Sequence, residues 1–333
     1  MKVATWHGGT KFTVDNVPDP APGPGEVVVK IDTCGICGTD VHITQGLFPS
    51  TPPRVLGHEY SGVIAEVGMG VRSRRVGDKV ACEPSSYCRK CFECRNGRQS
   101  RCVNAKGAPG YAQYAILPAH ATHRLPEGLG LQEAALLEPA SCCLTGLERA
   151  GMKKGDSVLV IGGGNMGLIT VGLAKLRGAG TTILSELSPE RRAMAKQMGA
   201  DIVHDPAKEP LRAVVDRVSD GRGVDFACEA VGKPEVLDIA VQMVRPRGTV
   251  EMLGVPPKGS RLPSDLYDTQ YKEISLVCIF GRGDGARRVL PMLAKLKLVG
   301  MFARRFPLER IQEGFAASAG AKGVKFAIAP NAR

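Results

Sequence analysis

Four cysteines lie close together in the first third of the chain, with the spacing C-x2-C-x2-C-x7-C: Cys88, Cys91, Cys94 and Cys102. Thiolates at this spacing can surround one tetrahedral Zn²⁺, because each short gap allows a tight turn that directs two sulfurs to one point. All four ligand positions would be filled, so this zinc would be structural. An iron–sulfur cluster is the alternative that four cysteines also permit.

A second set of possible ligands combines sulfur, imidazole and carboxylate. Cys37 precedes the pair His58-Glu59 by about twenty residues. Three protein ligands and one open position are typical of a catalytic zinc. His58 taken alone would be an ordinary structural histidine. Beside the other motifs, Cys37 and His58 are interpreted as ligands of a second, catalytic zinc.

A glycine-rich turn follows the apolar run 158–161. It reads Gly162-Gly163-Gly164-Asn165-Met166-Gly167, a G-x-G-x-x-G pattern between a predicted strand and a predicted helix. This context is typical of a dinucleotide site, where the first glycine permits a tight turn, the second lets the backbone approach the pyrophosphate, and the third allows close packing. The helix N-terminus would supply amide donors.

Glu186 ends the next predicted strand and bears on which dinucleotide is bound. A carboxylate there can accept hydrogen bonds from the adenosine ribose hydroxyls and repel a 2′-phosphate. Arg191 and Arg192 follow closely and could pair with such a phosphate, or simply face solvent at the start of a helix. We predict NAD as the cofactor, in preference to NADP.

The elements that must position these groups change in character near residue 130. Before it, short β-branched stretches separated by Gly and Pro predict a β-rich region. After it, a helical region at 132–147 must be interrupted or started by Pro139. Strand-like and helix-like segments then alternate, which predicts a parallel, doubly wound sheet. The predicted strands are 157–161, 181–185, 224–229, 249–253, 275–279 and 324–328, and the predicted helices are 164–177, 189–198, 210–218, 234–244 and 285–296.

The composition is that of an ordinary globular protein and limits the possible partners. The 333 residues suit about two domains. No stretch approaches the roughly 20 apolar residues that span a bilayer, and no signal peptide is visible, so we expect a cytoplasmic protein whose eleven cysteines are thiols or metal ligands. The net charge of +11 is spread along the chain and aromatic residues are few, so neither nucleic acid nor membrane is an expected partner.

Together these stretches resemble the zinc-containing medium-chain dehydrogenases, the family of alcohol, sorbitol and threonine dehydrogenases. The resemblance implies an α/β fold in which a Rossmann domain (140–280) is inserted in a β-rich, GroES-like catalytic domain (1–139 and 281–333) with a structural zinc lobe at 88–102. The segments that carry it are Cys34–His42, Gly57–Gly68, the four-cysteine lobe, Glu138-Pro139, the glycine turn, Glu229–Gly232 and Phe306–Phe315.

The resemblance also implies roles for single residues. Cys37 and His58 carry over as ligands of the catalytic zinc, with Glu59 as a ligand or an exchangeable neighbour. Glu138 stands where alcohol dehydrogenases have a second cysteine, and Glu138-Pro139 resembles the sorbitol and polyol branch. Proton transfer would run from the alcohol to Thr39 and, through the nicotinamide ribose, to His42. Contacts with the nicotinamide half and the pyrophosphate are implied at Val231, Gly232, Leu253, Val255 and Lys325.

The implied activity is hydride transfer from a secondary alcohol, a polyol or a vicinal diol, to NAD⁺. It would use two zinc ions per chain, a small-molecule substrate and a homo-oligomer, either a dimer or a tetramer. A threonine 3-dehydrogenase or a 2,3-butanediol dehydrogenase has the same motifs and stays open. A zinc-free quinone reductase leaves both zinc sites unexplained. A zinc-stabilised nucleic-acid-binding protein leaves the glycine turn, Glu186 and the pair Cys37 and His58 unexplained.

Overall fold

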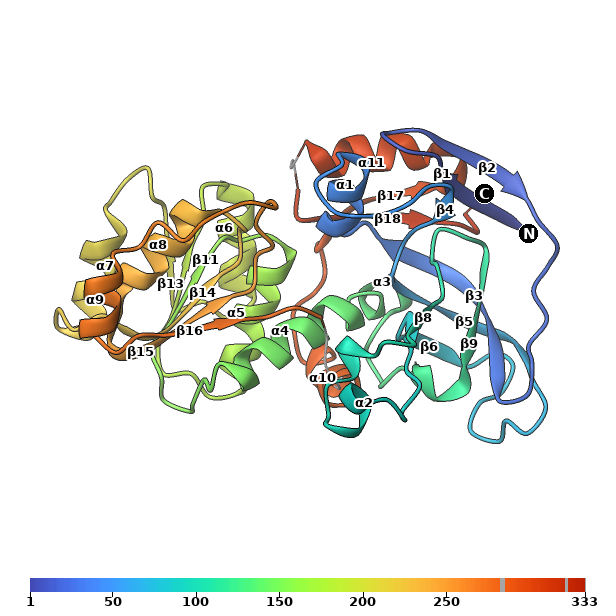
Figure 1. Ribbon diagram of the computed structural model, residues 1–333, viewed down its shortest axis with the longest axis horizontal. Coiled ribbons are helices and arrows are strands. Elements are labelled where there is room, and N and C mark those ends of the chain that lie inside the picture. The colour runs from blue at the N-terminus through green and yellow to red at the C-terminus, as the bar shows by residue number, and fades with distance from the viewer. Residues whose placement is uncertain (282–284, 321–322, 333) are drawn as a thin grey trace. The chain divides into compact units, whose positions relative to one another are not determined.

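The computed structural model describes residues 1–281, 285–320 and 323–332, and the chain divides into two compact units (Figure 1). Unit 1 comprises Met1–Pro139 and Ala286–Arg333, and unit 2 comprises Ala140–Gly285. The chain returns to unit 1 at Ala286, a few residues after the predicted boundary at 281. No helix of the described residues is long and apolar enough to cross a membrane.

Unit 2 is built on a six-stranded parallel sheet with the order β13-β12-β11-β14-β15-β16. The strand order reverses beside β11, which is the arrangement of a dinucleotide-binding doubly wound sheet. The predicted α/β fold class is therefore confirmed. The strands are β11 (Val158–Ile161), β12 (Thr182–Ser185), β13 (Ile202–His204), β14 (Val224–Glu229), β15 (Val244–Met252) and β16 (Ser275–Cys278).

Helices cover both faces of this sheet. Leu159 and Ile161 lie in the core that α7 (Leu211–Ser219) and α8 (Pro234–Met243) complete. On the opposite face, Gly167 of α5 (Asn165–Leu176) packs against Val160. All of β11 is buried, which explains its uninterrupted apolar sequence, because a parallel strand covered on both faces needs no polar alternation. The other helices here are α6 (Pro189–Gln197) and α9 (Leu266–Tyr271).

Unit 1 is β-rich, and its largest sheet has the order β10-β6-β5-β3-β18-β17, with β9 also paired to β3. The C-terminal strand β18 pairs with β3, so both ends of the chain contribute to one core. The strands of this sheet are β3 (Glu26–Gly35), β5 (Glu59–Val67), β6 (Lys79–Cys82), β9 (Tyr114–Pro118), β10 (Thr122–Arg124), β17 (Phe302–Pro307) and β18 (Lys325–Ala329).

Short elements complete unit 1. A three-stranded sheet has the order β2-β1-β4, and β7 pairs with β8 beside the four-cysteine lobe. Helix α4 crosses from unit 1 into unit 2. The strands are β1 (Lys2–Trp6), β2 (Phe12–Asn16), β4 (Arg54–Val55), β7 (Ser85–Ser86) and β8 (Lys106–Gly107), and the helices are α1 (Gly38–Thr44), α2 (Phe92–Arg95), α3 (Leu131–Ala134), α4 (Leu137–Arg149), α10 (Ala286–Leu293) and α11 (Ile311–Ala319).

A few elements differ from the sequence-based expectations. The region 132–147 forms two helices, with Pro139 in the first turn of α4, where its missing N–H costs no intrahelical bond. Strand β13 was not predicted because it has only three residues. Strand β17 was not predicted because its exposed Arg304 and Arg305 break the alternation of apolar and polar residues.

One buried acid of unit 2, Glu251, has no ion-pair partner in the described part of the chain. Glu251 lies on β15 opposite Cys228 of β14 and is fully buried, and among the described residues no N–H or O–H group donates to its carboxyl oxygens, although the Cys228 thiol lowers its pKa in part. Gly146 packs so closely that a methyl group there would overlap Glu251 Oε1. Burial raises the pKa of Glu251 to about 8. The folded protein therefore holds this carboxyl neutral near pH 7.

We predict that the protein loses stability as the pH rises from about 4.5 to about 8, because the unfolded Glu251 carboxyl ionises in this range and the folded one does not. Glu251→Gln should raise the free energy of unfolding by about 3–5 kcal/mol at pH values above 8 and change it little near pH 4. Urea unfolding measured across this pH range tests it. Glu235→Gln, an exposed site in α8, is the matched control. The same pH dependence in wild type and Glu251→Gln would contradict the prediction.

Candidate metal and nucleotide sites

Cys37 is held at the N-terminus of helix α1. Its sulfur accepts a hydrogen bond from the backbone N–H of Thr39 at 3.4 Å, and its own backbone N–H donates to the Asp40 carboxylate at 3.3 Å. These two hydrogen bonds fix the orientation of the Cys37 side chain at the start of the helix. The local sequence Cys37–Asp40 therefore both starts the helix and aims a sulfur ligand.

His58 and Glu59 reach Cys37 because β5 pairs with β3. Glu59 lies opposite Gly35 in this register, and Cys37 follows Gly35 by two positions. One ligand atom from each of Cys37, His58 and Glu59 lies within 4.8 Å of the other two. Sulfur, imidazole nitrogen and carboxylate oxygen are the donors that zinc takes in proteins, so this cluster fits a zinc ion.

Asp40, which the sequence analysis did not select, orients His58. Its Oδ1 lies 3.4 Å from His58 Nδ1, and its Oδ2 accepts a hydrogen bond from the Tyr111 hydroxyl at 2.8 Å. Because Nδ1 faces the carboxylate, Nε2 is the nitrogen left for a metal, as in carboxylate–histidine–metal arrangements. The capping pattern, an acidic residue three positions after Cys37, is the sequence signal that could have identified Asp40.

Burial and neighbouring groups have opposite effects on the pKa values of Asp40 and His58. Burial works to raise the pKa of Asp40, but His58, Tyr111 and the Cys37 N–H together lower it below its usual value. Burial works to lower the pKa of His58, but Asp40 and Cys37 raise it well above its usual value. The cluster therefore attracts positive charge to the imidazole, and a metal ion would take the place of that proton.

Glu59 forms a buried ion pair with Lys325. The Lys325 Nζ lies 2.5 Å from Glu59 Oε2, and both side chains are almost fully buried. Burial works to lower the pKa of Lys325, but Glu59 and Cys37 raise it, so the side chain is an ammonium ion. The expected pyrophosphate contact of Lys325 stays a prediction. Within unit 1 its partner is a carboxylate of the candidate metal site.

The other predicted catalytic residues lie in helices. Glu138 is the second residue of α4 and is half-buried, and among the residues that the structure describes it is not part of the three-donor cluster. Thr39 is the second residue of α1, and His42 lies in the last turn of the same helix. Both are half-buried. The ligand role of Glu138 and the proton transfer by Thr39 and His42 stay predictions.

The four-cysteine lobe is a closed cluster. The sulfurs of Cys88, Cys91, Cys94 and Cys102 all lie within 4.8 Å of one another. The Cys88 and Cys102 sulfurs are 3.5 Å apart, far longer than the about 2 Å of a disulfide. A tetrahedral zinc with bonds of about 2.3 Å would separate its sulfurs by about 3.8 Å. The donor set and its spacing therefore fit zinc.

Hydrogen bonds to sulfur accompany this cluster. The Cys91 backbone N–H donates to Cys88 and the Cys88 backbone N–H donates to Cys102, each at 3.4 Å. The Asn104 side-chain amide and backbone N–H groups lower the pKa of Cys88 to about 6. Burial raises the pKa of Cys94 to about 12, so a metal must displace its proton.

The glycine turn of unit 2 is tight, packed from behind and open in front. Gly162 has a φ of +103°, in the region that favours glycine. A methyl group at Gly167 would overlap the carbonyl oxygen of Gly162, so helix α5 packs directly on the turn. At Gly164 no neighbouring atom lies within 4 Å of an added Cβ. This is the cradle that a pyrophosphate needs at a helix N-terminus.

Glu186 directly follows β12 and is tied to this turn. Its Oε2 accepts the Gly163 N–H at 2.6 Å, and its Oε1 accepts the Ser188 N–H at 2.8 Å. Arg192 is paired with Asp205 at 2.8 Å, whereas the Arg191 guanidinium lies 3.9 Å from Glu186 Oε2. The Glu186 carboxylate is thus fixed in orientation beside the candidate phosphate cradle.

The remaining predicted cofactor contacts are distributed over unit 2. Asn165 is buried at the start of α5, and its Oδ1 has no hydrogen-bond partner in the described part of the chain. Met166 and Val255 are half-buried, Leu253 is buried and Val231 is exposed.

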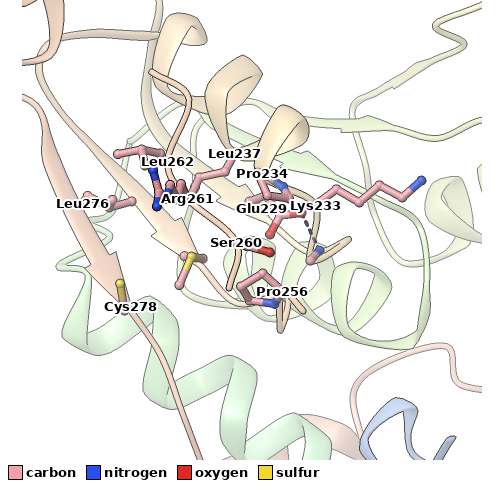
Figure 2. Close-up of a pocket in the computed structure, with 12 residues that line it drawn as sticks. Glu229, Lys233, Pro234, Leu237, Pro256, Ser260, Arg261, Leu262, Leu276 and Cys278 are labelled. Atoms are coloured by element: carbon pink, nitrogen blue, oxygen red, sulfur yellow. Dashed lines mark hydrogen bonds between the residues drawn. The ribbon is translucent and has the colours of Figure 1, made fainter. Parts of the chain in front are cut away.

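A pocket of about 240 Å³ opens where β14, β15 and β16 end and α8 begins (Figure 2). Glu229 lies in its wall and accepts the backbone N–H groups of Val231 and Gly232, each at 2.7 Å. Burial raises the pKa of Glu229. Ligands of doubly wound sheets bind beyond the carboxyl ends of the strands, which is this edge.

Comparisons with known proteins match both units. Residues 23–127 match the family model "Alcohol dehydrogenase GroES-like domain", and residues 166–296 match "Zinc-binding dehydrogenase". The L-threonine 3-dehydrogenase of Pyrococcus abyssi is 38% identical over 266 residues, which cover 77% of this chain and 75% of that protein. The sorbitol dehydrogenase of Halalkalibacterium halodurans is 34% identical over 261 residues, which cover 76% of each.

A solved structure resembles the whole chain. It is a zinc-binding dehydrogenase from Sinorhizobium meliloti 1021 bound to NADP, with a TM-score of 0.90 and 33% sequence identity over 99% of both chains.

Proposed function

The chain belongs to the zinc-dependent medium-chain dehydrogenases, and we propose that it oxidises the secondary alcohol of a small polyol or vicinal diol to a ketone with NAD⁺. The family brings zinc and a nicotinamide cofactor. The observation that carries the proposal is that one chain has two separate clusters. One is the three-donor cluster of Cys37, His58 and Glu59, and the other is the closed four-cysteine cluster. A zinc site with three protein donors keeps a position for substrate, whereas four thiolates leave none.

When bound, zinc supplies Lewis-acid stabilisation of the substrate oxygen, and the nicotinamide accepts the hydride. Cys37 and His58 would hold this zinc, with Glu59 or Glu138 as the third ligand, and Asp40 fixes the ring of His58. The Thr39 hydroxyl would take the proton of the substrate alcohol, and the His42 imidazole would pass it to water. Helix α1 carries both residues, so the element that presents the sulfur ligand also presents the proton path.

The substrate class is supported by the carboxylate at position 138. A carboxylate is a harder ligand than the thiolate of the alcohol dehydrogenases and suits a site whose substrates bring several oxygens. The similarity to a sorbitol dehydrogenase agrees with this. Threonine is the second candidate substrate, because the threonine dehydrogenase of Pyrococcus abyssi has the higher identity, 38% against 34%.

We predict that kcat/KM with NAD⁺ is highest for vicinal diols and sugar alcohols, and about 100-fold or more lower for ethanol. A site built to hydrogen-bond several hydroxyls leaves its polar groups unpaired when a substrate lacks them. Sorbitol, xylitol, 2,3-butanediol, threonine and ethanol measured under one set of conditions test this. Threonine leading the series would select the second candidate, and ethanol leading it would overturn the substrate class.

We further propose two zinc ions per chain, one in each cluster. Metal analysis should give two zinc ions for the wild type and one for each of Cys37→Ala and Cys94→Ala, because each substitution removes a donor from one cluster. Cys82→Ala is the matched control, since Cys82 is a buried thiol outside both clusters. A single zinc ion in the wild type would contradict the proposal.

The variant Asp40→Asn tests whether Asp40 supports zinc binding at the Cys37 and His58 cluster alone. Loss of the carboxylate that orients His58 should weaken retention of only the catalytic zinc, by about 10- to 100-fold in affinity. Tyr111→Phe removes one hydrogen bond to Asp40 and leaves the carboxylate, so its effect should be smaller.

The NAD⁺ preference is proposed to depend on Glu186. We predict that Glu186→Ala raises kcat/KM with NADP⁺ relative to NAD⁺ by about tenfold or more, because the repulsion of a 2′-phosphate is lost. Glu186→Gln is the sharper variant, since its amide oxygen can still accept the Gly163 N–H while the charge is gone. A wild type that prefers NADP⁺ would show that Arg191 or Arg192 determines the cofactor instead.

A homo-oligomer is also proposed, and the edge of the unit 2 sheet supports it. Strand β16 ends the sheet on one side and is largely exposed. Tyr267 and Tyr271 of α9 and Leu276 of β16 are exposed apolar side chains. Open, apolar strand edges favour association. Light scattering that gives the 35.3 kDa of one chain would contradict the proposal.

A further inference from the structure

Arg192 of helix α6 joins the ends of two neighbouring strands of unit 2. Its Nη2 lies 2.8 Å from Oδ2 of Asp205, the residue directly after β13. Its Nη1 donates to the backbone carbonyls of Glu186 and Leu187, which directly follow β12, at 2.8 and 2.6 Å. A planar guanidinium with several fixed donors can make these contacts together, whereas the compact ammonium of a lysine is not shaped for them.

The contacts around Arg192 are shielded from water and held in place by their surroundings. The side chains of Arg192 and Asp205 are 17% and 16% exposed. Strands β12 and β13 pair with Ser185 opposite His204, and the Ser185 hydroxyl lies 2.9 Å from His204 Nδ1. The other oxygen of Asp205 accepts the Ala207 N–H at 3.1 Å. The carboxylate that holds Arg192 is therefore itself fixed in orientation.

The turn that Arg192 holds is the one that carries Glu186, the proposed ribose ligand. Leu187 in this turn is 71% exposed, so its side chain contributes little packing to keep the turn in one conformation. Hydrogen bonds from Arg192 to the two carbonyls take over this task. The charge of Arg192 is met by Asp205, so it does not neutralise the Glu186 carboxylate. The cation that approaches this carboxylate is Arg191, at 3.9 Å.

We propose that Arg192, held by Asp205, is a positioning residue that fixes the turn after β12 so that Glu186 meets the adenosine ribose, and that Arg192 is not a ligand of a 2′-phosphate. The inference rests on the proposed role of Glu186 in selecting NAD⁺. A 2′-phosphate would have to compete with Asp205 and with two backbone carbonyls for the guanidinium. The pair thus favours NAD⁺ in two ways: it keeps one cation away from the phosphate, and it keeps in place the carboxylate that repels the phosphate.

The test measures the Kd of NADH and of NADPH by nucleotide fluorescence for wild type, Arg192→Leu, Glu186→Ala and the double variant Arg192→Leu/Glu186→Ala. Without Arg192 the turn can rearrange and the hydrogen bonds of the charged Glu186 to the ribose are lost, so NADH should bind about tenfold more weakly. NADPH gains little from Glu186, so its Kd should change little. The ratio of the NADPH Kd to the NADH Kd should therefore fall by about tenfold in Arg192→Leu. In the Glu186→Ala background, Arg192→Leu should change this ratio by less than about twofold, because Arg192 acts through Glu186.

Lys175→Met is the matched control. The ion pair of Lys175 with Asp201, at 3.0 Å, also joins a helix to β13, but at the beginning of that strand. Its removal should leave the ratio of the two Kd values at the wild-type value. If Arg192→Leu does not fold because Asp205 is left unpaired, Arg192→Leu/Asp205→Asn takes its place, since this variant removes both charges and keeps an acceptor for the Ala207 N–H.

Three results would overturn the proposal. A higher ratio in Arg192→Leu would show that Arg192 binds the 2′-phosphate. An unchanged ratio would show that Arg192 does not position Glu186, and an equal fall with and without Glu186 would show that it acts on the nucleotide by another route. A wild type that binds NADPH more tightly than NADH would instead refute the proposed NAD⁺ preference. These are binding measurements, so a wild type that oxidises no alcohol would refute the proposed reaction without deciding this test.

Discussion

The geometry of the candidate catalytic site depends on one buried carboxylate, that of Asp40. A carboxylate that is 2% exposed must be compensated by donors, and Asp40 finds them in the Cys37 backbone N–H, the Tyr111 hydroxyl and the His58 ring. These three contacts join the helix that carries the sulfur, the loop that carries Tyr111 and the start of strand β5. Because each donor is needed to offset burial, none can move without a cost to the other two. For this reason the two candidate ligands Cys37 and His58 are held in a fixed arrangement.

Strand β3 positions Cys37 and His58 relative to the large sheet of unit 1. It pairs with β5, β9 and β18, so segments from the beginning, the middle and the end of the chain meet along it. Its last residue, Gly35, leads directly to Cys37 and leaves room for Glu59 and Lys325. In unit 2 the glycine turn has a similar role. There the close contact of Gly167 with the Gly162 carbonyl sets the distance between α5 and β11. In both units a glycine is needed where backbone and functional groups crowd together.

The features that could be predicted from the sequence are those encoded over short separations. The four cysteines lie within one loop, and their sulfurs gather at one point. The strand, glycine turn and helix of unit 2 follow one another directly in the sequence. Spacing alone therefore identifies the four-cysteine site and the dinucleotide site. The predicted sheet of unit 2 followed from its alternating periodicity for the same reason. Tyr111 with Asp40 and Lys325 with Glu59 are contacts between distant segments, and residue type gives no hint of the partner. Glu251 was also missed, since nothing in its strand indicates that its carboxyl is buried with no ion-pair partner among the described residues.

The two candidate metal clusters balance their charge in different ways, and burial decides which way. The four thiolates carry more negative charge than one Zn²⁺ neutralises, but the lobe is at the surface, where water, N–H groups and the exposed Arg89, Lys90, Arg95 and Arg98 offset the excess. In the cluster of Cys37, His58 and Glu59, the Glu59 carboxylate and the neighbouring Asp40 are buried, so their negative charges must be met inside the fold. Lys325 is the buried cation at that position. The buried Glu59 carboxylate of this candidate site therefore has an internal ammonium ion, that of Lys325, as its counter-charge.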